Sequence, residues 1–244
     1  MTPQPLSKVM PGSTLNDLII TPAFLEIADP VLVGLVMRVI ATWSYVDLAL
    51  TDLISVFLRA DFEVVNEMFI ALIGSTQRRA VRDAASLTLS ENDRELYVQV
   101  MKRLGPIEKH RNDFAHSIWA YARSMPEALL LIDPKALARH NAKYIVTLRG
   151  MREWIRWVNT HPGSDADWTT APEAPELAGF VDGLDQSLVM VYRKKDLEQE
   201  LAAVQRAERL VQTLHDMIAL ADDEARSALA ILLQQGQSSQ PEST

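Results

Sequence analysis

Residues 29–59 read DPVLVGLVMRVIATWSYVDLALTDLISVFLR, and this stretch decides the fold class. Asp29 suits the N-cap of a helix, and Pro30 suits its first turn, where a missing backbone N–H costs nothing. Apolar residues then recur every three or four positions, which is the period of a helix with one apolar stripe. They are Leu32, Leu35, Val39, Trp43, Val46, Leu50, Leu53 and Phe57. The pattern predicts one long helix, over roughly 31–59.

Other stretches repeat this spacing farther along the chain. Apolar residues recur at helical intervals over 62–72, 143–158 and 188–220. A shorter helix is expected over 75–89, and residues 223–234 either extend the 188–220 helix or form a short separate one. Ser90 is a suitable N-cap for another helix, because acids follow it where the helix dipole favours them. That helix is expected to break near Gly105-Pro106, since proline removes a backbone hydrogen bond, and to resume through His116. The chain is therefore predicted to be all-α or mainly α.

Two segments interrupt the helical pattern. Residues 117–123 and 129–132 form either a small β-hairpin or a loop. Residues 159–187 are rich in Pro, Gly, Asp and Thr, which is typical of a lid, an insertion or a disordered excursion. We predict one helical domain over 29–234 that carries this loop insertion. An N-terminal arm (1–28) precedes the domain, and a disordered tail (235–244) follows it.

Composition limits the chemistry that is available to the chain. Its 244 residues include no cysteine, which excludes disulfides, thiolate metal sites and a cysteine nucleophile. The sequence has no HExxH-type histidine pair, no glycine-rich phosphate loop and no GxSxG elbow. We therefore expect neither a metal ion nor a cofactor.

The N-terminal sequence and the most apolar stretch both bear on location. The N-terminus lacks the charged-then-apolar profile of a secretory signal. The most apolar stretch, 31–58, carries Arg38, Asp47 and Asp52, which disfavours a membrane span. These features predict a cytoplasmic protein that makes no membrane contact.

The net charge of −8 argues against a broad electrostatic surface for nucleic acid, so any RNA contact must be local. Two basic clusters are present. The candidate RNA-binding cluster comprises Lys102, Arg103, Lys109 and His110. The other comprises Arg78, Arg79 and Arg82, which we expect to be a solvated helix face.

The segment Arg111-Asn112-Asp113-Phe114-Ala115-His116 ends a predicted helix. An arginine followed by a polar residue, with a histidine after a gap of four, resembles the motif of the HEPN superfamily. The helical setting is similar too: a long helix with Trp43 and Asp47, a helical pair, the motif helix, and a closing helix introduced by residues 191–197. The resemblance covers roughly 30–220 and implies an HEPN-like helical bundle with a long up-down helix pair.

The resemblance also implies an activity. In this family two protomers usually pack so that their motifs meet in a shared cleft, and the enzyme members cut RNA without a metal ion. The chain would then be a homodimeric, metal-independent endoribonuclease. It would serve as a toxin or an antiphage defence effector, with an antitoxin or regulatory protein as a further partner.

Three residues would form the active site under this resemblance. Asn112 and His116 are four residues apart and lie one above the other on a helix, and the long Arg111 side chain reaches the same patch. His116 would move a proton during attack by the ribose 2′-OH, and Arg111 would bind the scissile phosphate. Asn112 would orient His116 or the phosphate. Use of the 2′-OH would restrict cleavage to RNA and leave a cyclic phosphate end.

Two other functions stay open. A catalytically silent HEPN-like protein would use the same helices for dimerisation or partner binding, and the acidic balance favours this reading. A helical regulator or ligand-binding protein outside the family would leave Arg111 and His116 apart in space. Asp47 on the long helix could pair with Arg111, although an acid near the middle of a helix is usually exposed.

Overall fold

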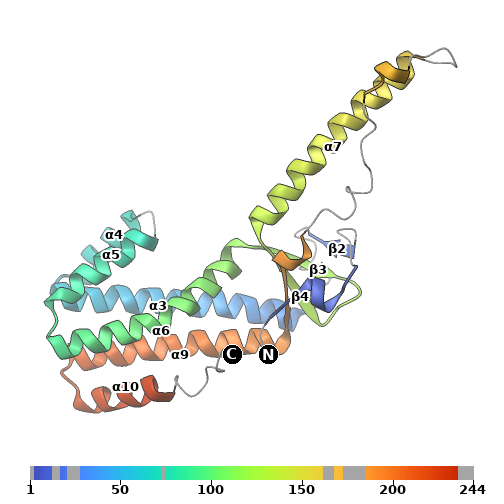
Figure 1. The fold of residues 1–244 in the computed structure, drawn as a ribbon. Helices are drawn as coiled ribbons and strands as arrows, with labels where there is room; N and C mark the ends of the chain where they lie inside the picture. The colour runs from blue at the N-terminus through green and yellow to red at the C-terminus, as the bar shows by residue number, and fades with distance from the viewer. Residues whose placement is uncertain are drawn as a thin grey trace. The chain divides into compact units, whose positions relative to one another are not determined.

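The computed structural model describes residues 3–12, 17–20, 28–72, 75–161, 168–172 and 185–235 (Figure 1). The chain divides into two compact units, each assembled from two separate stretches. Unit 1 comprises Met1–Gly34 and His116–Asp196, and unit 2 comprises Leu35–Ala115 and Leu197–Thr244. The sequence predicts one helical domain over 29–234, whereas the packing assigns this range to two units.

Unit 2 is helical and contains most of the long helices α3 (Pro30–Leu58), α6 (Glu91–His116) and α9 (Lys194–Ala219), each of which has one end in unit 1. Side-chain contacts join α3 to α6 and α3 to α9. The rings of Phe57 on α3 and Tyr97 on α6 meet edge to face, with centroids 5.5 Å apart. Asp52 on α3 lies 3.1 Å from the Nε2 of His215 on α9. Their buried apolar residues include Trp43, Val46, Leu50, Leu53, Val100, Leu104, Val204, Val211 and Leu214.

The described part of unit 2 also contains the shorter helices α4 (Phe62–Ala71), α5 (Ser75–Ala85) and α10 (Asp223–Gln235). A short 3-10 helix, Ser86–Thr88, follows α5. The Asp61 side chain caps α4 by accepting a hydrogen bond of 2.8 Å from the Glu63 N–H. The Arg226 guanidinium on α10 lies 2.7 Å from Asp93 on α6 and so links these two helices.

The predicted break in the motif helix is wrong, because α6 runs without interruption from Glu91 to His116. Pro106 lies inside it and removes one backbone hydrogen bond. Leu104 and Phe114 on either side are each 1 % exposed. Burial of such side chains is worth about 1.5–3 kcal/mol each, which offsets the lost hydrogen bond and proline strain.

Unit 1 contains a small antiparallel sheet in the order β1-β5-β4-β3-β2. Its strands are β1 (Gln4–Pro5), β2 (Leu18–Ile19), β3 (Ile118–Ala122), β4 (Ala128–Ile132) and β5 (Val189–Arg193). The β3–β4 pair confirms the predicted hairpin, with Ala120 opposite Leu130. The predicted N-terminal arm supplies both edge strands and the short helix α1 (Leu6–Val9).

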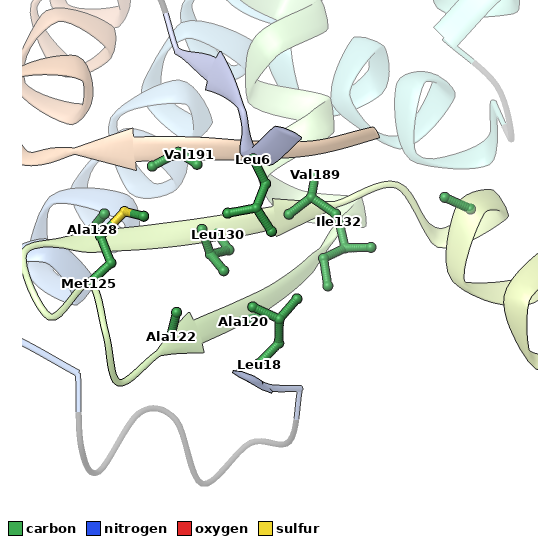
Figure 2. Packing of buried hydrophobic residues seen from close by; sticks show 11 residues of the cluster. Leu6, Leu18, Ala120, Ala122, Met125, Ala128, Leu130, Ile132, Val189 and Val191 are labelled. Carbon is green, nitrogen blue, oxygen red and sulfur yellow. The ribbon is translucent and has the colours of Figure 1, made fainter. Parts of the chain in front are cut away.

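One face of this sheet carries a purely apolar cluster, which Figure 2 shows from close by. Alternate residues of β4, namely Ala128, Leu130 and Ile132, point to the same face because side chains in a strand have a period of two. Leu6 of α1 lies on this face together with Val191 of β5. Each of these five residues is at most 2 % exposed, so the cluster is a complete small core.

Two predicted helices begin at other residues than expected. The expected start of the 188–220 helix is a strand instead, because Val189–Arg193 pairs with β4 along its whole length. The helix α9 follows only from Lys194. The helix predicted over 143–158 is longer: α7 spans Pro134–Thr160, and the Asp133 side chain caps it through the Lys135 N–H at 2.7 Å.

The structure describes only parts of the predicted insertion 159–187. A 3-10 helix spans Trp168–Thr170, and another, Gln186–Leu188, leads into β5. The rest of the insertion lies outside the described residues, as does the predicted tail from 236 onward. The mainly α fold class is confirmed.

Within the described part of the chain, only α3 is long and apolar enough to pass as a membrane span by length and composition. A core helix passes the same test. Trp43, Val46 and Leu53 of α3 are at most 2 % exposed and belong to the interior of the protein. Only 33 % of the apolar window is buried, however, and Val31, Met37 and Leu48 are at least 50 % exposed. The cytoplasmic location stays a prediction.

Candidate functional site

The three motif residues lie on about the last two turns of α6, which ends at His116. Arg111 and Asn112 are half-buried, whereas His116 is exposed. Phe114 between them is 1 % exposed and anchors this end of the helix. Asn112 and His116 are thus four residues apart on one continuous helix, as predicted.

The Arg111 guanidinium is held by its neighbour in the sequence. Its Nη1 donates a hydrogen bond of 2.9 Å to the side-chain oxygen of Asn112. Its Nε is buried and makes no hydrogen bond within the described residues. A guanidinium has five N–H donors, so Arg111 retains unused donors for an anion.

Asp47 of α3 is an electrostatic neighbour of Arg111. Burial raises the pKa of the Asp47 carboxyl group above its ordinary value, and Glu108 raises it further. The Arg111 charge, a hydrogen bond from Trp43 and the Arg82 charge lower the pKa without cancelling the effect of burial. The sequence left a pairing of Asp47 with Arg111 open, and the structure brings the two charges together.

Arg82 on α5 completes what we call the charged cluster, which consists of Asp47, Arg82, Glu108 and Arg111. Arg82 is only 5 % exposed, and its Nε has no hydrogen-bond partner among the described residues. The predicted solvated face is therefore wrong for Arg82, although Arg78 and Arg79 are exposed. The reason is that α5 turns Arg82 inward with the buried Ala85.

Glu108 connects the cluster to the protein surface. Its Oε2 lies 3.4 Å from the Nη2 of the exposed Arg79. Sequence reasoning missed both Arg82 and Glu108. A signal for Glu108 was present, because it precedes Arg111 by three residues and so shares a helix face with it. No local pattern marks Arg82 as buried.

Of the four candidate RNA-binding residues, two are exposed lysines, and the other two make hydrogen bonds to other helices. Lys102 and Lys109 are exposed. Arg103 instead donates a hydrogen bond of 3.0 Å to the Leu233 carbonyl and holds α10. The Nδ1 of His110 lies 3.1 Å from the Glu200 carboxylate on α9, and this hydrogen bond raises the pKa of His110.

Among the described residues, no group of three or more His, Cys, Asp or Glu side chains converges as a metal site would require. The expectation of chemistry without metal or cofactor stays a prediction.

Comparisons of the chain with protein-family models, curated proteins and solved structures find no match. The fold and the site define the class: a mainly helical protein with a small antiparallel sheet and an Arg-Asn motif beside a partly buried charged cluster. The likeness to the HEPN superfamily therefore rests on the motif and its helical setting alone.

Proposed function

We propose that the chain is a metal-independent endoribonuclease of the HEPN type that acts as a homodimer. Arg111, Asn112 and His116 form the active site in this proposal, and RNA is the substrate. The observation that carries it is the end of α6, where an exposed histidine follows an arginine whose guanidinium is fixed by Asn112 at 2.9 Å. Fixed donors stabilise developing charge because they need no reorganisation during the reaction.

The proposed reaction needs only groups that the motif supplies. His116 takes the proton of a ribose 2′-OH, and the oxygen attacks the adjacent phosphorus. Arg111 stabilises the negative charge on the phosphate oxygens through its free donors. The bond between phosphorus and the 5′-oxygen breaks, and that oxygen takes up a proton from solvent water. His116 then releases the proton that it took from the 2′-OH to solvent. The products are a 2′,3′-cyclic phosphate and a 5′-hydroxyl end.

A second candidate is a catalytically silent dimerisation or partner-binding protein of the same type. The observation that favours it is the engagement of Arg111 with both Asn112 and the charge of Asp47, which gives the arginine a structural use. The net charge of −8 points the same way, since it opposes RNA binding.

The test is cleavage of mixed tRNA and mRNA in EDTA by the parent chain and by His116→Ala. Loss of the proton-transfer group is expected to lower the rate by at least about 100-fold. The matched control is His161→Ala, which removes an exposed histidine that belongs neither to the motif nor to the candidate RNA-binding cluster and should cut like the parent. The double variant Arg111→Ala, His116→Ala should leave RNA intact while keeping its helical circular-dichroism spectrum.

Full activity of His116→Ala would refute the proposed site. No cleavage by the parent at high protein excess would favour the silent protein instead. The mass of the chain in solution, measured by light scattering, tests the homodimer: a monomer at micromolar concentration argues against a shared active site.

A further inference from the structure

A pocket of about 230 Å³ opens in unit 2 between α3, α4 and α5. Figure 1 labels α4 and α5 next to each other and α3 separately. Arg78 and Arg82 of α5 form a cationic wall, one exposed and one 5 % exposed. Arg111, Asn112 and His116 do not line it. The pocket is therefore separate from the motif, although Asp47 belongs to its lining and is also a neighbour of Arg111.

Arg82 is the observation that points to a ligand. Its Nε is buried without a hydrogen-bond partner among the described residues, which is costly for a charged group. Asp47 is the one acid of the pocket lining, and it also interacts with Arg111. Two arginines against one carboxylate give the pocket a net charge of +1 (2 − 1) in a chain of net charge −8. The pocket is therefore suited to an anion.

The other lining residues narrow the chemistry of that anion. Ser44 and Thr51 place hydroxyl groups along the α3 side, and Asn66 places an amide on the α4 side. The Ser44 and Thr51 hydroxyls already donate to backbone carbonyls of α3, at 3.4 Å and 2.9 Å, and can only accept from a ligand. The donors that remain are the Asn66 amide on α4 and the two guanidinium groups on α5, and together they suit the three terminal oxygens of a phosphate better than the two oxygens of a carboxylate. Arginine is also the side chain that binds phosphate most specifically, through paired N–H donors.

Apolar residues at the same pocket indicate that the ligand carries an organic group. Leu48 and Ile70 line it, yet they are 50 % and 63 % exposed. Phe69 is buried beside them. An organic group seated here would remove exposed apolar surface from water at about 25 cal/mol per Å².

We infer that this pocket binds a small organic phosphate. Arg78 and Arg82 hold the phosphate group, and Leu48, Phe69 and Ile70 contact the organic part. The inference stands apart from RNA cleavage, because it uses no residue of the motif and its test contains no RNA.

Phenyl phosphate is the probe, titrated into the full chain by isothermal calorimetry at constant ionic strength. We expect saturable binding with a Kd below about 1 mM. Arg82→Met keeps the side-chain volume and removes the charge, and it should raise the Kd at least about ten-fold. Arg78→Ala changes an exposed residue of the pocket lining, and it should also weaken binding.

The matched control is Arg79→Ala, because Arg79 is the next residue on α5, carries the same charge and does not line the pocket. Its Kd should stay within about two-fold of the parent. His116→Ala should bind like the parent even if it no longer cuts RNA. The pocket and the ribonuclease proposal can therefore fail separately.

Three outcomes would overturn the inference. The first is no heat and no rise in Tm up to about 10 mM phenyl phosphate. The second is equal weakening by Arg79→Ala, which would mean a general charge effect. The third is benzoate binding as tightly as phenyl phosphate, which would assign the pocket to carboxylates.

Discussion

The apolar cluster on the sheet and the charged cluster in the helical unit are built on opposite principles. On the sheet, Leu130 and Ile132 are fully buried among other apolar side chains (Figure 2). In the helical unit, Arg82 is buried and Asp47 is half-buried, and the Arg82 Nε has no hydrogen-bond partner in the described part of the chain. The sheet cluster needs no explanation beyond stability. Buried charges cost folding energy, so the charged cluster is where function is to be sought.

The largest expected effect is loss of stability on the sheet. Leu130→Ala removes a fully buried side chain at the centre of the apolar cluster and should lower the free energy of unfolding by about 2–5 kcal/mol. Urea unfolding followed by circular dichroism measures it. The control Val146→Ala changes a side chain that is 67 % exposed and should have an effect within about 0.5 kcal/mol. A loss in Leu130→Ala no larger than in this control would contradict the core assigned to the sheet.

The next effect concerns whether ionised Asp47 raises or lowers the free energy of unfolding. Burial raises the pKa of Asp47 in the folded state, so its stabilising contribution is present below the ordinary value of 3.8 and is lost as pH rises through the raised pKa. Asp47→Asn cannot ionise and should therefore become more stable relative to the parent over this pH range. Unfolding at a series of pH values measures the difference. If instead the free energy of unfolding of the parent rises relative to that of the variant as pH rises, attraction to Arg111 and Arg82 outweighs the effect of burial.

A smaller effect is expected at Tyr97, whose hydroxyl is buried without a hydrogen-bond partner among the described residues. Burial raises the pKa of this hydroxyl to about 12. Tyr97→Phe removes the unpaired group and keeps the ring that packs on Phe57. The free energy of unfolding should stay the same or rise by up to about 1 kcal/mol. A clear loss in thermal or urea unfolding would mean that the hydroxyl has a partner.

The smallest effect is expected at the surface pair of His110 and Glu200. Their hydrogen bond raises the pKa of His110, so the stability it adds is complete below about 6.5 and is lost as pH rises through the raised pKa. His110 is about half exposed, so solvent screening limits the effect to a few tenths of a kcal/mol. Glu200→Gln should therefore lower Tm at about pH 5 and leave it unchanged at about pH 9. An equal change in Tm at both pH values would mean that Glu200 stabilises the protein through packing and not through the charge of His110.

Local sequence patterns predicted where helices and strands lie better than they predicted which of these elements pack or pair with one another. The Asp29-Pro30 start and the apolar stripe placed the long helix within one residue at each end, over 31–59 against Pro30–Leu58. The hairpin was foreseen as one of two outcomes. The helix-breaking effect of Pro106 was overestimated. The burial of Leu104 and Phe114, which keeps α6 continuous, comes from tertiary contacts that a local sequence pattern does not contain. For the same reason Val189–Arg193 was assigned to a helix, although it pairs with β4.

The sequence by itself determined that the chain is mainly helical and that Arg111, Asn112 and His116 end one helix, because helical period and spacing are local properties. Only the tertiary structure decided that Arg82 is buried, that Asp47 approaches Arg111, and that α3, α4 and α5 enclose a pocket. Burial and electrostatic neighbours depend on which distant segments pack together. The sequence indicates which face of each helix or strand is apolar. Which of these faces pack against one another depends on the tertiary fold.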